Sequence, residues 1–131
     1  SRLYSIKRTR VNAYCSSLGK CILANYSNSE LENIMKDCSF IKFTPNTISD
    51  MEQLRTELAK VRKQGWAMED EEYETGQRCI GAPVYDYKGD IVAAISASGE
   101  KHVLTDDRIN EVADYLVKKA FELSKALGYV E

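Results

Sequence analysis

The chain has 131 residues, of which 44% are hydrophobic and 29% charged, and its net charge is −2. A chain of this length forms one domain and buries roughly two-thirds of its unfolded surface without disulfides or metals. The charge balance excludes a basic nucleic-acid-binding domain, and no apolar stretch approaches the ~20 residues that cross a bilayer. We therefore expect a single soluble domain, 1–131, without a membrane segment.

The four cysteines, Cys15, Cys21, Cys38 and Cys79, contain no Cys-x-x-Cys pair, and His102 is the only histidine. This is not the ligand set of a structural zinc site. Reduced, mostly buried thiols in the cytoplasm are the simpler interpretation. The common glycine-rich phosphate loops and the Gly-x-Ser-x-Gly nucleophile motif are also missing from the sequence. We expect no metal, no cofactor and no catalytic activity.

Strand-type residues open the chain, and serines mark the starts of the helices that follow. The first strand is expected around Leu3, Tyr4, Ile6 and Val11. Three helix starts are predicted from N-cap serines and capping boxes: Ser16 or Ser17 before a short helix, Ser29 with Glu32 before a second, and Ser49 with Glu52 before a third that Gly65 ends.

Three further strands and one long helix complete the predicted order. A short strand is expected at 66–69, and the apolar runs 79–85 and 91–98 flank a hairpin turn at 86–89. Thr105 is expected to cap the last helix, which Gly128 ends. Its predicted buried stripe comprises Ile109, Val112, Leu116, Ala120, Leu123 and Leu127. Helices mixed with antiparallel hairpins predict an α+β fold.

The predicted hairpin brings small polar side chains onto one face of the sheet. If its loop has an even number of residues, Cys79 faces Ser96, and Ser98 shares their face because side chains alternate along a strand. Such a patch suits the floor of a pocket, although small residues packed under a helix would look the same. A three-residue loop with Gly89 in a bulge would shift the register by one and break this alignment.

Two other segments have alternative interpretations. The run 16–19 lies at a helix start, where free N–H groups attract an anion, although an ordinary N-cap is equally compatible. The acidic run 69–72 is most simply a solvated loop. A nucleophilic pair of His102 with a cysteine is disfavoured, because the neighbours of His102 indicate an exposed loop.

Several segments together resemble one family, the IclR-type transcriptional regulators, in their order and spacing. They are 17–20 (SLGK), 43–50 (FTPNTISD), 61–66 (VRKQGW), Glu71-Glu72, 76–84 (GQRCIGAPV), 94–99 (AISASG) and 127–129 (LGY). The similarity is to the C-terminal effector-binding domain of that family and covers nearly the whole chain.

The resemblance implies a GAF/PAS-like (profilin-like) fold, with a twisted antiparallel sheet and helices on both faces. It implies a regulatory domain, typically of a repressor of a catabolic operon, that binds a small organic acid such as a sugar acid or a 2-oxo acid. It also implies a homodimer or homotetramer that contacts operator DNA only through an N-terminal winged helix-turn-helix, which we expect to be missing from this chain.

The effector site implied by the resemblance comprises Ser17, Leu18, Gly19, Glu69, Cys79, Ser96 and Ser98. Two departures from the family pattern occur: Glu69 stands where aspartate is usual, and Asn12-Ala13-Tyr14 replaces a Pro-Leu-His-like segment. The more polar side chains favour a hydroxylated sugar acid or 2-oxo sugar acid. The alternative function is a GAF-fold thiol enzyme of the methionine sulfoxide reductase type, using Cys79 with Cys15 or Cys21.

Overall fold

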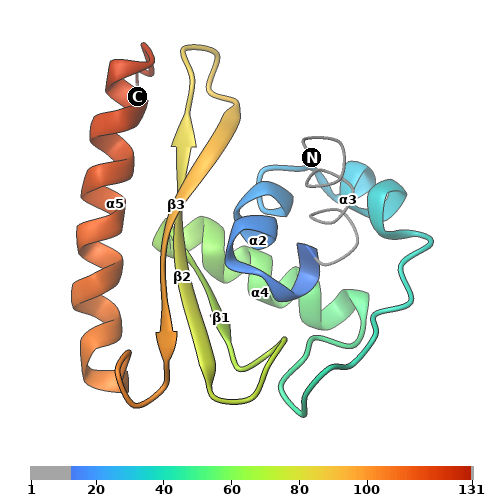
Figure 1. The fold of residues 1–131 in the computed structure, drawn as a ribbon. Coiled ribbons are helices and arrows are strands. Elements are labelled where there is room, and N and C mark those ends of the chain that lie inside the picture. Colours follow the sequence, from blue (N-terminus) through green and yellow to red (C-terminus); the bar gives the residue numbers. More distant parts are fainter. Residues whose placement is uncertain (1–12, 131) are drawn as a thin grey trace, which may run out of the picture.

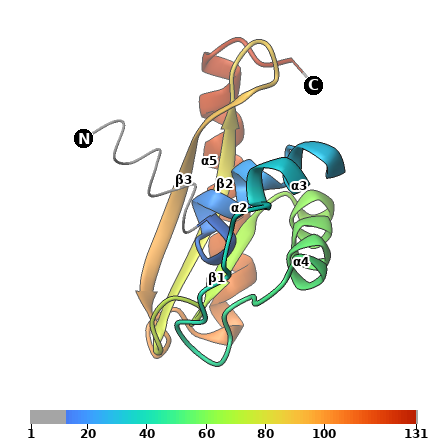
Figure 2. The same cartoon turned by 90° about the vertical axis from the view of Figure 1, so that its right-hand side faces the viewer.

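A three-stranded antiparallel sheet in the order β1-β2-β3 separates two helical layers in the computed structural model, which describes residues 13–130 (Figure 1). Helix α5 covers one face, and α2 and α4 lie on the other, with α3 beside them (Figure 2). The predicted α+β fold with helices on both faces is confirmed, whereas the strand expected around Leu3 lies outside the described residues. The elements are η1 (Ala13–Cys15), α2 (Ser17–Leu23), α3 (Asn28–Met35), α4 (Met51–Gln64), β1 (Ala67–Asp70), β2 (Gln77–Tyr85), β3 (Ile91–Glu100), η2 (Asp106–Arg108) and α5 (Ile109–Ala126).

The helices begin close to their predicted caps, but three of the four caps are different residues. Ser16 caps α2, and its Oγ accepts the N–H of Gly19 at 3.0 Å. Helix α3 begins two residues earlier than expected, because the reciprocal capping box forms between Ser27 and Glu30 rather than between Ser29 and Glu32. A serine followed by glutamate three residues later occurs twice in this segment, and the earlier pair gives the longer helix.

Helix α4 and the last helix also differ from expectation at their starts. The carboxylate of Asp50, not the hydroxyl of Ser49, caps α4 by accepting the N–H of Gln53 at 2.8 Å. Gly65 ends α4 in the left-handed conformation (φ 86°), as predicted. Thr105 precedes η2 instead of α5, and its hydroxyl donates to Asp107 rather than capping the backbone. Within residues 13–130, no helix is long and apolar enough to span a bilayer.

The β2–β3 hairpin has a register two residues away from the predicted one. The loop has three residues, since Asp86 N–H donates to Asp90 O at 2.9 Å and Gly89 adopts a φ of 81°. A bulge between Val84 and Tyr85 then shifts the register again in the same direction. Cys79 therefore faces Ser98 rather than Ser96. Because a two-residue shift preserves the side-chain alternation, all three side chains remain on one face.

The buried stripe of α5 departs from the prediction near its C-terminal end. Leu123 and Leu127 are 46% and 48% exposed, whereas Ser124 is buried. The hydroxyl of Ser124 accepts the N–H of Tyr85 at 2.9 Å and donates to Ala120 O at 2.8 Å. A serine can occupy this position because it satisfies a backbone donor of β2 that has no strand partner there. The predicted burial of Leu123 and Leu127 is therefore wrong.

Candidate functional site

The face of the sheet that α2 covers carries a row of polar side chains across all three strands. Glu69 of β1 is directly opposite Cys79 of β2, and Cys79 is directly opposite Ser98 of β3. Directly opposed residues of antiparallel strands project from the same face. In the next row, Ser96 is opposite Gly81. The structure thus places a carboxylate, a thiol and two hydroxyls on one surface, of which the β3 serines are exposed.

Helix α2 contributes Ser17 to this row from above the sheet. Ser17 is 3% exposed, and its Oγ lies 3.0 Å from the Sγ of Cys79. A Cβ atom on Gly81 would lie 3.0 Å from the same Oγ, so the missing side chain of Gly81 makes room for Ser17. The sequence reasoning did not single out Gly81, although a glycine inside a predicted strand is a known signal of close approach.

Gly19 does not offer the free backbone N–H that the sequence predicts at the start of α2. Its N–H donates to Ser16 Oγ, so this group is occupied by the ordinary N-cap. A Cβ on Gly19 would lie only 2.3 Å from the Cα of Ala13, so the glycine allows α2 to pack against η1. Leu18 is partly exposed. The predicted residues that come together around Cys79 are therefore Ser17, Glu69, Ser96 and Ser98.

The acidic run 69–72, which begins in β1 and continues into the loop after it, is not the solvated loop that composition favours. Glu69 and Glu72 are buried, and Glu69 Oε2 accepts the N–H of Glu72 at 2.8 Å. Thr44 and Thr47 donate their hydroxyls to the carbonyl oxygens of Glu71 and Glu72. Burial is the largest cause that raises the pKa of Glu69, while backbone N–H donors oppose it.

Lys20 anchors this loop and was not identified from the sequence. Its side chain has 0% exposure, and its Nζ lies 2.6 Å from Glu57 Oε2, 2.7 Å from Met68 O and 2.8 Å from Glu72 Oε1. One ammonium thereby joins α2 to α4, β1 and the loop. Burial raises the pKa of Glu72, and the nearby Lys20 opposes this effect. Since Glu72 donates its N–H to Glu69, the network holds Glu69 in place beside Cys79.

Cys15, Cys21 and His102 lack the environment that nucleophilic catalysis requires. Burial raises the pKa of both Cys15 and Cys21 to about 12, so neither is a thiolate near neutral pH. His102 lies on the surface with its Nε2 3.1 Å from Glu100 Oε2. No cluster of three or more metal-ligating side chains occurs among residues 13–130. Cys15 and Cys21 are therefore not suited to act as thiolate partners of Cys79.

Comparisons with known proteins find that the sequence and the fold of this chain are similar to those of regulatory proteins. Residues 1–125 match the family described as "Bacterial transcriptional regulator IclR C-terminal". The chain belongs to this family, whose compared members are transcription regulators and not enzymes. The thiol-enzyme alternative is thus not supported.

Three relatives illustrate the range of similarity. The chain is 35% identical over 120 residues to the HTH-type transcriptional repressor AllR of Escherichia coli K12, covering 92% of this chain and 44% of AllR. It superimposes on the IclR protein of Thermotoga maritima with a TM-score of 0.82 at 41% identity, covering 89% and 47% of the two chains. For a double mutant of the inducer-binding domain of PobR from Acinetobacter, in a complex with 3-hydroxybenzoic acid, the TM-score is 0.80 at 26% identity, covering 86% of this chain and 65% of that one. The chain spans about half the length of the curated relatives that it matches.

Proposed function

We propose that residues 1–131 form the effector-binding domain of a cytoplasmic IclR-family repressor of a catabolic operon. The effector is a small organic acid, and its binding controls how a winged helix-turn-helix on the N-terminal side contacts operator DNA. The single observation that carries the proposal is the row of Glu69, Cys79 and Ser98 under Ser17.

The chemistry of the row suits an oxygen-rich anion. The hydroxyls of Ser96 and Ser98 lie on alternate positions of β3 and are exposed, so both can donate to a carboxylate or a 2-oxo group. Ser17 and Cys79 lie beside them. Glu69 can accept from a ligand hydroxyl while it is ionised and donate to a ligand oxygen when it is protonated. This combination favours a hydroxylated sugar acid or a 2-oxo acid.

The relatives support the class of ligand and the direction of regulation. AllR is a repressor by name, and the PobR domain was crystallised with a hydroxylated aromatic acid. A polar row of a thiol, hydroxyls and one carboxylate favours a more hydroxylated acid for this chain.

Self-association follows from the same proposal. A homodimer or homotetramer would let an effector change the relative positions of two DNA-binding domains. The effector must then favour one arrangement of the subunits over another, since equal affinity for both shifts no equilibrium.

Thermal-shift screening with glyoxylate, pyruvate and D-gluconate tests the proposal. An acid at 100 times its dissociation constant adds about 2.7 kcal/mol to the free energy of unfolding. Calorimetric titration of the acid found should then show binding weakened roughly ten- to a hundredfold in Ser96→Ala or Ser98→Ala, because each loses a hydrogen bond to a charged group. Unchanged affinity in both variants would place the effector elsewhere.

Ser39→Ala is the matched control for this titration, because Ser39 is exposed and lies outside the site. Ser124 is unsuitable as a control, because its buried hydroxyl bonds to both Tyr85 and Ala120. Its loss would change stability as well as any binding.

A further inference from the structure

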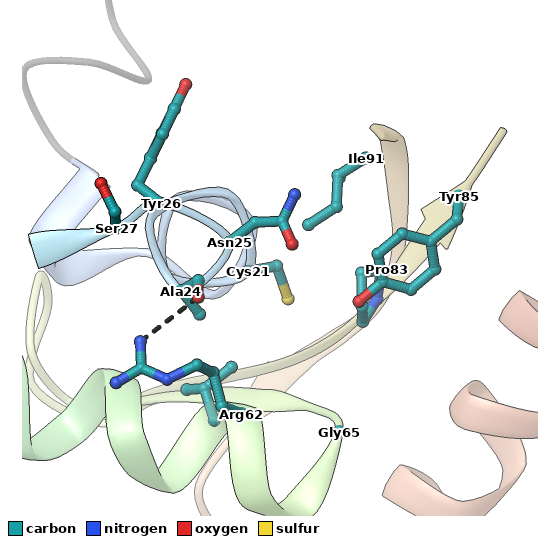
Figure 3. A pocket seen from close by; sticks show the side chains of 11 residues that line it. Cys21, Ala24, Asn25, Tyr26, Ser27, Arg62, Gly65, Pro83, Tyr85 and Ile91 are labelled. Atoms are coloured by element: carbon teal, nitrogen blue, oxygen red, sulfur yellow. Dashed lines mark hydrogen bonds between the residues drawn. The ribbon is translucent and has the colours of Figure 1, made fainter. Parts of the chain in front are cut away.

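A hollow lies at the far end of α2 from Ser17 (Figure 3). Its volume is about 440 Å³, within the roughly 300–1,000 Å³ of small-molecule sites. The end of α2, the last turn of α4 and the hairpin ends of β2 and β3 form its walls. Site residues Cys79 and Ser98 lie toward the opposite end of the hairpin, so this groove is separate from the proposed effector site.

The groove exists because β1 is shorter than β2. The first residue of β1, Ala67, pairs with Gly81, so within residues 13–130 the stretch of β2 from 82 to 85 has no strand neighbour on that side. The chain instead leaves α4 through Gly65, whose φ is 86°. A Cβ atom built on Gly65 would meet nothing within 4 Å. The rim of the groove is therefore open beside the unpaired edge of β2.

This unpaired edge cannot accept an added peptide strand. Alternate residues of a strand direct their backbone groups to the same side, and on this side the relevant nitrogens belong to Pro83 and Tyr85. Pro83 has no N–H, and the N–H of Tyr85 already donates to Ser124 Oγ at 2.9 Å. The edge thus offers no backbone donor for strand addition, and the volume suits a small molecule better than a peptide.

The polar groups around the groove are few and include one charge. Of the residues that the structure describes, Arg62 is the only charged one that lines it, and within the same residues its guanidinium makes one hydrogen bond, to Ala24 O at 3.2 Å. Among residues 13–130, the side-chain amide of Asn25 and the hydroxyl of Tyr85 form no hydrogen bond with the protein. Figure 3 shows the amide of Asn25 turned toward the space between α2 and the strands. These groups are available to a ligand.

The rest of the wall combines the hydroxyls of Tyr26 and Ser27 with apolar side chains. Val61, Pro83 and Ile91 line the groove from α4 and the two strands. The ring of Tyr85 is fixed by stacking on Tyr129, with centroids 5.0 Å apart. A partly apolar wall with one cation, which forms no ion pair among residues 13–130, and several neutral polar groups has the composition of a site for an amphipathic anion.

We propose that this groove binds a small carboxylate with an apolar body, such as an aryl carboxylate. The carboxylate pairs with the free donors of Arg62, whose planar fork matches it in two parallel hydrogen bonds. The apolar body of the ligand lies against Val61, Pro83 and Ile91. Asn25 and Tyr85 contact the polar groups of the ligand. The site is independent of the proposed effector site and needs no change in that proposal.

Titration of the ¹⁵N-labelled chain with benzoate, followed by NMR, tests this site. Saturable shifts are expected at the amides of Ala24, Asn25, Gly65 and Tyr85, and benzyl alcohol should produce them at least about tenfold more weakly because it lacks the charge. Absence of shifts at these amides, or equal binding of benzyl alcohol, would overturn the proposal.

Substitutions on α4 then separate specific pairing from general charge attraction. Arg62→Gln should weaken benzoate binding by about tenfold or more, whereas Lys63→Gln, with the same change in charge on an exposed neighbour, should leave it unchanged. Equal effects of the two variants would contradict a site at Arg62. Arg62→Lys, which retains the charge but loses the fork, should bind with intermediate affinity and provides a second variant if Arg62→Gln unfolds.

The result can be distinguished from failure of the effector proposal. Ser98→Ala should leave benzoate shifts at Gly65 and Tyr85 unchanged, because Ser98 does not line the groove. Shifts centred on Ser96 and Ser98 that persist in Arg62→Gln would support the effector site and exclude the groove.

Discussion

Lys20 and Glu72 form an ion pair in the interior of the protein, with Nζ 2.8 Å from Oε1 and side-chain exposures of 0% and 8%. Glu57 and the carbonyl of Met68 complete the surroundings of the ammonium. Because Glu72 in turn donates its N–H to Glu69, the position of Glu69 depends on a lysine of another element. A buried lysine of this kind is compatible with folding only when its charge is paired.

The first prediction is that Lys20→Met lowers the free energy of unfolding by about 3–5 kcal/mol, because it leaves buried carboxylates without their cation. Urea unfolding measures the change. Lys60→Met, on an exposed position of α4, should change it by less than about 0.5 kcal/mol. If the two variants have equal stability, the buried network does not stabilise the fold.

The contrast between Lys20 and the serines of β3 shows what the sequence can predict. The two-residue period of a strand places Cys79, Ser96 and Ser98 on one face, and that prediction holds because the three-residue loop and the bulge shift the register by two in total. The burial of Lys20 was not predictable in this way. It depends on carboxylates 37 and 52 positions away, which no local pattern brings together.

The helix caps and the buried side of α5 illustrate a second limit of prediction from the sequence. The existence and order of the helices follow from apolar periodicity, but Ser27 and Ser29 are both followed by a glutamate three residues later, and local rules do not choose between them. Likewise Ser124 replaces Leu123 on the sheet side of α5 because Tyr85 needs an acceptor. Which residue lies on the buried side of the helix is here determined by a tertiary hydrogen bond.

The second prediction concerns close packing at α2. Gly19→Ala should destabilise the protein by about 1–3 kcal/mol despite the better helix propensity of alanine, because the new Cβ meets the backbone of Ala13. Gly99→Ala is the control, since its Cβ would lie 3.8 Å from Leu104 Cβ, an ordinary contact. Thermal unfolding compares the two. A Gly19→Ala variant as stable as the wild type would show that α2 and η1 can separate at little cost.

The third prediction concerns the thiols. With a pKa of about 12, Cys15 and Cys21 carry a thiolate in roughly one molecule in ten thousand at about pH 8. A chromogenic disulfide reagent should therefore label Cys38 and Cys79, which are half-buried, well before the other two. In denaturant all four should react at similar rates. Rapid labelling of Cys15 or Cys21 in the native protein would contradict the expected protection of these two thiols by burial.

The last prediction links the buried carboxyl groups to the dependence of stability on pH. Burial raises the pKa of Glu69 and Glu72 above the ordinary value of 4.5. The folded protein therefore holds these protons more tightly than the unfolded chain. In the pH range from 4.5 up to the raised values, the unfolded state binds fewer protons, so the free energy of unfolding falls as the pH rises.

Glu69→Gln should flatten this decline, because an amide does not titrate and its oxygen can still accept the N–H of Glu72. Glu71→Gln is the matched control: the N–H of Gly76 is the first cause that lowers the pKa of Glu71, so its contribution lies below pH 4.5 and has the opposite sign. Urea unfolding from pH 4.5 to about pH 8 measures the slopes for the three proteins. The expected result is a shallower slope for Glu69→Gln and a wild-type slope for Glu71→Gln above pH 4.5. Parallel curves for all three would mean that Glu69 has the same proton affinity in the folded and unfolded states.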